Sequence, residues 1–341
     1  MLDIVGKRGW YFLVSALIIL PGLISLIYPP GWLSLESGLN AGIDFTSGSV
    51  LNMTFEDRID EADIQARMDE LGYPEALIQK IGSRSVFIRT KLLDDEDSSD
   101  RGPFRPECIE DGRSERQCIQ DDLDKFVGAV ESVDFASISP IIARETVKNA
   151  FYAMLAASVV IMLYIWYAFR KVPKAYRYGF SAILALVHDV LFVLGVFSIL
   201  GRVVNMEVNS MFIVGLLIVA GYSVNDTIVV FDRIRENVMR HPDRPLAGLV
   251  NLSILDTMGR SLNTSFTTLF VLLAMLLIGG PSIQGMLLVV ALGAVVGTYS
   301  SVFIASQFLI IWDRGEIGKL LRRGRRGPAA AAAGLLHLIG R

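Results

Sequence analysis

The chain has 341 residues, of which 52% are hydrophobic and 20% are charged, and its formal net charge is −3. Its mean hydropathy of +0.48 is too high for a soluble globular protein, and the apolar residues stand in long blocks. Composition therefore excludes a soluble fold and predicts a polytopic α-helical membrane protein.

Six apolar blocks are long enough to cross a bilayer as helices. They cover residues 10–28, 150–169, 179–200, 208–231, 261–278 and 285–312. We interpret the first block as a retained helix and not as a cleaved signal peptide, because no small-residue cleavage site follows Tyr28. The prediction is six transmembrane helices with one soluble domain between the first and the second.

Basic residues indicate which side of the membrane each loop faces. Arginines and lysines gather before the first helix and after the second, fourth and sixth helices, so these segments share one side. By the positive-inside rule that side is cytoplasmic, and both termini are predicted to be cytoplasmic. Residues 36–148, on the opposite side, carry 25 acidic and 13 basic residues.

The predicted domains follow from these blocks. They are the cytoplasmic N-terminus with helix one (1–33), an extracytoplasmic domain (34–148), helices two to six (149–313) and a basic cytoplasmic tail (314–341). In the extracytoplasmic domain, alternating apolar residues predict strands at 50–55, 76–81, 86–90 and 133–138, and helical spacing predicts helices at 61–71 and 121–130. The order βαββαβ favours a small α+β ferredoxin-like domain.

Residues 92–117 interrupt this pattern and are interpreted as a solvated insertion. A calcium loop counted from Asp95 would place Asp100 at the required glycine and Pro106 at the required glutamate, so calcium binding is not expected. Cys108 and Cys118 are the only cysteines; in an oxidising compartment they could pair, and the alternative is two free thiols. No metal site is expected in this domain, because it has no histidine.

Ionisable residues inside the spans are the main functional signal. Asn225 and Asp226 lie within the fourth span, where a charged side chain costs at least about 2.5 to 3.5 kcal/mol. Asp226 is therefore either a proton or ion site or a paired structural charge. His188 and Asp189 lie near the middle of the third span, where neighbouring side chains point about 100° apart. Asp189 is either an accessory relay group or a structural hydrogen-bond acceptor, and a structural role is favoured more strongly for His188.

A polar stripe runs along one face of the fifth span. Its members recur at i, i+3, i+4 and i+7: Arg260, Asn263, Thr264 and Thr267. The depth of Arg260 matches that of Asp226, so a helix shift that made or broke their contact would change proton affinity. Asn225, Asn263 and Thr264 could donate hydrogen bonds or hold water beside them. The alternative for Arg260 is an anchor that extends to the lipid headgroups.

The sixth span places small residues at every fourth position, namely Gly293, Gly297, Ser301 and Ala305. Such spacing lets a neighbouring helix approach closely, and we interpret this face as packing rather than chemistry.

Five segments carry a resemblance to a known family. They are GIDFTSGS (42–49), HDV (188–190), GYSVNDTIVVFDRIREN (221–237), RSLNTSFTT (260–268) and GTYSSVFIA (297–305). In sequence and order the chain resembles the SecF family of bacterial protein-export membrane subunits. The family usually has glycine where this chain has Ser47, so the backbone turn there is expected to differ.

The resemblance implies a half-transporter of the resistance-nodulation-division type in the bacterial inner membrane. It implies a SecD partner, the SecYEG channel and the SecA motor beside it, and preproteins as substrates, with YajC and YidC as further candidate partners. Proton flow through Asp226, facing an aspartate of SecD, would drive motion of the outer domains. No enzymatic activity, cofactor or nucleic-acid partner is expected, and the coupling ion is taken as H⁺ although the residues leave Na⁺ open.

Two other functions compete with protein export. A small-molecule exporter of the same superfamily would need an aromatic pocket in the outer domain, whose aromatic residues stand mostly at core positions. An intramembrane aspartyl protease would use Asp189 and Asp226 as a dyad sharing one proton. Their predicted depths differ by about 5 to 8 Å, which disfavours a dyad.

Overall fold

The computed structural model describes residues 3–27, 38–93, 114–204 and 206–315. The chain divides into two compact units, one of Met1–Asn40 with Ala150–Arg341 and the other of Ala41–Asn149. Six helices in the described residues are long and apolar enough to cross a membrane, which confirms a polytopic helical membrane protein.

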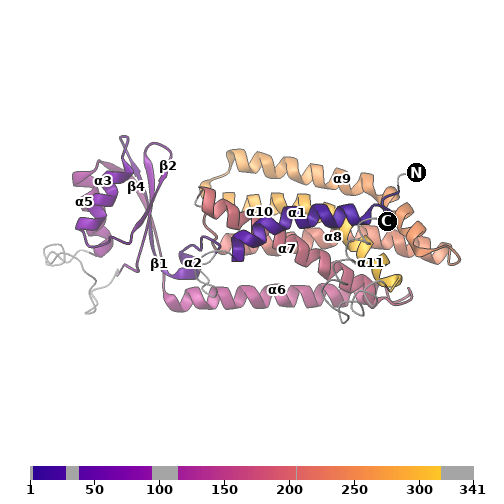
Figure 1. Cartoon of the computed structure of the whole chain (residues 1–341). Coiled ribbons are helices and arrows are strands. Elements are labelled where there is room, and N and C mark those ends of the chain that lie inside the picture. Colours follow the sequence, from indigo (N-terminus) through magenta and orange to yellow (C-terminus); the bar gives the residue numbers. More distant parts are fainter. Residues whose placement is uncertain (1–2, 28–37, 94–113, 205, 316–341) are drawn as a thin grey trace, which may run out of the picture. The chain divides into compact units, whose positions relative to one another are not determined.

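The six candidate spans are labelled in Figure 1. They are α1 (Arg8–Ile27), α6 (Pro140–Ala168), α7 (Tyr176–Val204), α8 (Ser210–Arg240), α9 (Leu246–Ile278) and a last helix made of α10 (Pro281–Ser300), the π-helical turn η1 (Ser301–Ala305) and α11 (Ser306–Asp313). The predicted blocks find all six, but α9 begins 15 residues earlier than the predicted residue 261. The added turns bury an amphipathic face that includes Leu249, Val250 and Ile254, and a hydropathy window does not detect such a face.

Helices α8 and α10 pack closely through small residues. A Cβ on Gly293 would overlap the side chain of Val219, and one on Gly297 would lie 3.1 Å from Cβ of Ser223. The contacting pairs are Gly215 with Val289, Val219 with Gly293, Ser223 with Gly297 and Thr227 with Ser301. Successive pairs are four residues apart on both helices, so the two helices run parallel. The predicted close-packing face of the sixth span is confirmed.

Helix α1 packs on α7 in the same manner. A Cβ on Gly22 would lie 2.5 Å from Cα of Gly195, and the hydroxyl groups of Ser25 and Ser198 lie 2.8 Å apart. This contact fixes the side of α7 that carries His188 against α1.

The second unit is a four-stranded antiparallel sheet with helices α3 and α5 on the same face (Figure 1). Its elements are α2 (Ile43–Thr46), β1 (Gly48–Phe55), α3 (Glu61–Glu70), β2 (Leu77–Ile81), β3 (Ser85–Thr90), α5 (Glu115–Phe126) and β4 (Val130–Ile138). The strand order is β2-β3-β1-β4, and Leu51 of β1 lies opposite Ile88 of β3 and Phe135 of β4. After the short α2, which was not predicted, the element order is the expected βαββαβ.

Helix α5 begins six residues before the predicted residue 121. Ser114 caps this helix. Its hydroxyl accepts a hydrogen bond from the backbone N–H of Gln117, and the side-chain oxygen of Gln117 accepts one from the backbone N–H of Ser114. The end of the predicted insertion therefore belongs to a core helix, and Cys118 is buried on it. Cys108 and the acidic run near Asp95 lie outside the described residues, so the predicted disulfide stays a prediction.

The turn before β1 has an unusual backbone. Ser47, at the position where the family usually has glycine, has a φ of 67°, which lies in the left-handed region that favours glycine. The next residue, Gly48, has a φ of 124°, and a Cβ there would lie 2.6 Å from the carbonyl oxygen of Thr90.

Candidate functional site

Asp226 lies on the buried face of α8 and is 3% exposed. Its one hydrogen-bond donor among the described residues is Thr298 of α10, whose hydroxyl lies 3.1 Å from Oδ2. The neighbouring Asn225 points to the exposed side of α8. The structure thus places one of the two predicted polar residues of this span in the interior and the other outside.

A chain of hydroxyl groups continues from Asp226 across three helices. Thr298 bonds to Ser265 of α9, and the hydroxyl of Tyr222 on α8 donates to Ser265 at 3.2 Å. Hydroxyl groups both donate and accept, so such a chain can hold a proton or a water beside the carboxylate.

A cavity of about 420 Å³ between α9, α10 and η1 borders this chain of hydroxyl groups. Its lining includes Ser261, Ser265 and Thr298, and the rest is mostly apolar, including Phe266 and Phe303. The hydroxyl groups nearest to Asp226 therefore lie at the wall of a mostly apolar space.

The predicted polar stripe forms one face of α9, but that face is exposed. Its members are Arg260, Asn263, Thr264 and Thr267. The hydroxyl of Thr264 donates to the carbonyl of Arg260 at 3.0 Å, so its hydrogen bond stays within α9. Among the described residues Arg260 makes no hydrogen bond or ion pair with Asp226. The predicted relay roles of these residues stay predictions, and the inward face of α9 is formed instead by Ser261 and Ser265.

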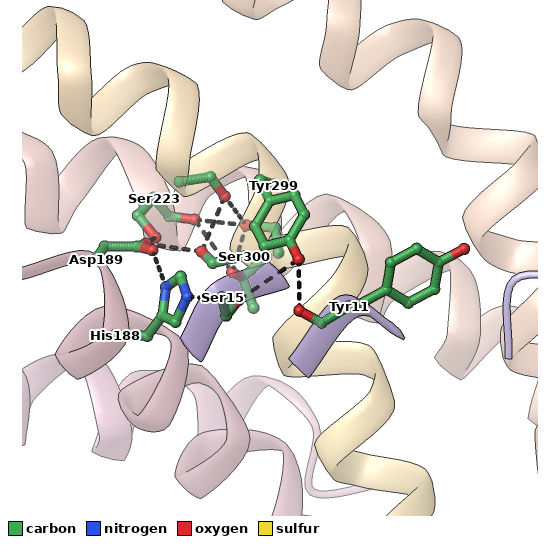
Figure 2. A network of polar contacts seen from close by, with 10 residues as sticks. Tyr11, Ser15, His188, Asp189, Ser223, Tyr299 and Ser300 are labelled. Carbon is green, nitrogen blue, oxygen red and sulfur yellow. Dashed lines mark hydrogen bonds and ion pairs between the residues drawn. The ribbon is translucent and has the colours of Figure 1, made fainter. Parts of the chain in front are cut away.

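Asp189 of α7 is fully buried and has three partners on three helices (Figure 2). Its Oδ1 lies 2.9 Å from Nδ1 of His188. Its Oδ2 accepts from the hydroxyl of Ser223 on α8 at 2.5 Å and from that of Ser300 on α10 at 2.7 Å. This carboxylate thus links α7, α8 and α10.

The network reaches α1 through His188. Its Nε2 lies 3.0 Å from the hydroxyl of Ser15, which lies 3.5 Å from the hydroxyl of Tyr299. Tyr299 in turn donates to the carbonyl of Tyr11 at 2.8 Å, as Figure 2 shows. The two ring nitrogens of His188 thus join the Asp189 carboxylate of α7 to the Ser15 hydroxyl of α1.

Sequence reasoning found the carboxylates but missed their hydroxyl partners. The interpretation of the sixth span as a packing face alone was incomplete, because Thr298 and Ser300 on it donate to Asp226 and Asp189. The available signal was the run Thr298 to Ser301, four consecutive hydroxyl-bearing residues in a span whose other polar residues are Ser306 and Gln307. The two aspartates have separate partners, which argues against a protease dyad, and no group of His, Cys, Asp and Glu in the described residues could hold a metal ion.

Comparisons with known proteins agree with this architecture. The family model for protein export membrane protein SecD/SecF, C-terminal, matches residues 119–315. Protein translocase subunit SecF of Thermobaculum terrenum is 39% identical over 97% of this chain and 100% of its own length, and that of Anaerolinea thermophila is 35% identical over 97% and 100%.

A solved structure is similar as well. The crystal structure of SecDF, a translocon-associated membrane protein from Thermus thermophilus, superimposes with a TM-score of 0.74 and 29% identity. The match covers 92% of this chain and 39% of that one. From its apolar spans, its fold and these matches, we conclude that the chain belongs to the SecD/SecF family of protein export membrane proteins.

Proposed function

We propose that this chain is the SecF-type subunit of a bacterial protein-export machinery, in which it works with a SecD partner and uses the proton motive force to promote preprotein translocation. The supporting relatives are named protein translocase subunit SecF and match over their full length. The match to the solved SecDF chain covers 39% of that chain, and we propose that a SecD partner completes the functional unit.

One observation carries the proton-coupling part of this proposal. Asp226 is a buried carboxylate inside a candidate span, and in the part of the chain that the structure describes it has a single hydroxyl donor. Because desolvation favours the neutral form and a nearby positive charge favours the anion, a change in helix packing alters how tightly such a group holds a proton. Proton affinity coupled to conformation is the requirement for a proton-driven machine, and H⁺ is the coupling ion that we propose.

The exposed stripe on α9 supports a membrane-embedded partner. Polar and charged side chains facing lipid are costly, and Arg260, Asn263, Thr264 and Thr267 all lie on the outer side of this chain. We therefore place SecD against this face, with an acidic residue near Arg260. Among the described residues Arg260 makes no hydrogen bond or ion pair with Asp226, so a partner helix could turn the exposed guanidinium towards that carboxylate.

The remaining parts of the proposal concern orientation and neighbours. The basic loops favour cytoplasmic termini, which would place the sheet domain outside the cytoplasm. Its strand order β2-β3-β1-β4, with two helices on one face, is that of a ferredoxin-like domain. In this position the domain could meet preproteins that emerge from a SecYEG channel fed by SecA.

The test uses inverted membrane vesicles that contain the chain, its SecD partner, SecYEG and SecA. We expect preprotein uptake to rise when the chain and SecD are present and a proton gradient is imposed, and this increment to disappear with a protonophore. An increment that survives the protonophore would contradict proton coupling. Proton-dependent dye transport without any effect on preprotein uptake would favour the small-molecule exporter.

A second measurement tests the partner surface. Asn263→Leu with Thr267→Leu makes the stripe apolar, and we expect it to reduce the amount of SecD that co-purifies with the chain. The matched control is Ser158→Leu on α6, where the hydroxyl bonds only to the carbonyl of Met154 on its own helix. Unchanged SecD recovery in both variants would show that lipid, and not SecD, covers the stripe.

A further inference from the structure

One short segment of α10 donates to both buried carboxylates. Thr298 donates to Asp226 at 3.1 Å and Ser300 donates to Asp189 at 2.7 Å. The segment ends where η1 begins, at Ser301, and π-helical turns inside α-helices often mark functional sites. Asp189 lies on α7 and Asp226 on α8, and the segment from Thr298 to Ser300 of α10 is hydrogen-bonded to both.

Each of the two hydroxyl groups has a second acceptor on its own helix. The hydroxyl of Thr298 lies 2.9 Å from the carbonyl oxygen of Ala294, and that of Ser300 lies 3.1 Å from the carbonyl oxygen of Gly297. A hydroxyl has a single proton to donate. Each donor can therefore serve either a carboxylate on a neighbouring helix or a backbone carbonyl of α10.

Asp189 also holds the neighbouring part of α8. Ser223, which donates to Asp189 at 2.5 Å, lies one turn before Asp226 and opposite Gly297 in the close α8–α10 contact. Asp189 is thus bonded to both helices that build the Asp226 site, one turn away from that site.

We propose that Asp189 is a positioning residue for the proton site: by accepting from Ser223 and Ser300 it fixes the register of α8 against α10, and with it the geometry in which Thr298 donates to Asp226. The inference rests on the proposed function, because it assumes that Asp226 carries the proton. It differs from a relay role, since Asp189 exchanges no proton with Asp226 in this scheme.

The ionisable groups that face the two carboxylates are few in the part of the chain that the structure describes. His188 on its own helix bonds Asp189, and through Ser15 it leads to Tyr299 of α10. On α9, next to the hydroxyl chain of Asp226, the charged residue is the exposed Arg260, and Tyr222 of α8 lies at the far end of that hydroxyl chain. A change in register would alter the hydroxyl donation at Asp226 without removing any of these groups.

The test compares Ser300→Ala with Ser306→Ala in the chain–SecD complex, by measuring proton-driven preprotein uptake in vesicles as a function of pH. Ser306 is a matched control, because it is fully buried in the same helical run and its hydroxyl donates only to the carbonyl of Ser301. We expect Ser300→Ala to move the pH of half-maximal uptake upwards by about half to one unit. The reason is that a disturbed register weakens the donation from Thr298 to Asp226, and a carboxylate that loses a donor holds its proton to higher pH. Ser306→Ala should leave that pH in place.

Three further variants make the result decisive. Ser223→Ala should reproduce the shift of Ser300→Ala, and it replaces that variant if Ser300→Ala fails to assemble with SecD. Asp189→Asn keeps an oxygen acceptor that is weaker than a carboxylate, so uptake should stay proton-driven with a shift in the same direction. If Asp189→Asn abolishes proton-driven uptake, Asp189 carries the proton itself and the positioning role is wrong.

The remaining outcomes are also distinguishable. Equal pH profiles for the parent, Ser300→Ala and Ser223→Ala would overturn the inference, as would an equal shift for Ser306→Ala. Asp226→Asn is included to test the proposed function separately. Proton-driven uptake that survives in that variant refutes the proton site itself, whatever Ser300→Ala does.

Discussion

The two buried aspartates of the helical unit are alike in burial and opposite in their bonding. Within residues 3–27, 38–93, 114–204 and 206–315, Asp189 is 0% exposed and has three partners, whereas Asp226 is 3% exposed and has one donor. A buried carboxylate needs several hydrogen bonds to stay charged at low cost. The comparison indicates that bonding, and not depth alone, separates a carboxylate that holds helices together from one that can exchange a proton.

The neighbours explain the difference. Asp189 faces the point where α7 meets both α8 and α10, so hydroxyl groups from two helices converge on it. Asp226 lies one turn beyond Ser223, where its partner Thr298 belongs to a hydroxyl chain that borders the cavity next to α9. The surroundings of Asp226 leave space for a change of hydrogen-bond partner, and those of Asp189 do not.

The largest expected effect is that of Asp226→Asn. Asparagine keeps the volume and the hydrogen bonding of Asp226 but does not titrate, so proton-driven preprotein uptake should be abolished while insertion and SecD binding remain. The control is Asp232→Asn, because Asp232 is an exposed residue of the same helix in an i,i+3 pair with Arg235. The uptake assay in vesicles measures both, and normal uptake in Asp226→Asn would remove the functional half of the comparison.

The next effect concerns Arg260, the charged neighbour of Asp226. If its guanidinium serves the carboxylate in the assembled complex, Arg260→Lys loses the planar fork and should lower proton-driven uptake about ten- to hundredfold. An arginine that only anchors α9 at the headgroups would tolerate lysine. Arg240→Lys is the control, because Arg240 is an exposed residue that pairs with Glu236 at the end of α8. Parent-like uptake in Arg260→Lys would mean that Asp226 finds its partner in SecD.

The sequence predicts the larger features of this molecule well. Long apolar blocks give the six spans, and the cost of a charge in lipid singles out Asp226 and Asp189 as residues that need an explanation. The amphipathic start of α9 and the first turns of α5 were missed, because their helical signal comes from one packed face and from the cap at Ser114.

The hydroxyl partners could not be predicted for a different reason. A serine or threonine in a membrane helix can always bond its own backbone, as Thr264 does. Whether it serves a carboxylate instead depends on which helix lies opposite, and no local pattern contains that information. The same holds for η1, since a π-helical turn adds one residue to an otherwise regular apolar helix.

A smaller effect tests the packing that holds both aspartates in place. Gly293→Ala places a methyl group against the stiff side chain of Val219, and we expect it to lower the free energy of unfolding by about 1 to 3 kcal/mol. Gly221→Ala is the matched control on the partner helix, because a Cβ there meets no atom within 4 Å. Thermal unfolding of the purified chain–SecD complex measures both. Equal stability of the two variants would show that the α8–α10 contact yields easily and is a poor basis for a fixed register.

The smallest effect extends the comparison to a carboxylate with a full ionic partner and no burial. Glu75 of the sheet domain lies 2.8 Å from Nζ of Lys91, and both side chains are more than 70% exposed. The hydrogen bond from Lys91, followed by its charge, lowers the pKa of Glu75. A lowered folded-state pKa stabilises the fold above the unfolded pKa of about 4.3 and loses that effect as pH falls through the folded value.

Water and salt screen such a pair, so Glu75→Gln should leave the unfolding temperature of the full chain nearly unchanged at pH 7. Any difference from the parent should vanish in acid and at high salt. Asp122→Asn supplies the contrast, because Asp122 accepts two hydrogen bonds from Arg67, at 2.5 and 2.8 Å, and both side chains are only 18% exposed. Calorimetry at several pH values should therefore rank Asp122→Asn as the more destabilising change. The reverse ranking would mean that burial does not set the worth of a bonded carboxylate in this protein, in the sheet domain or at Asp189.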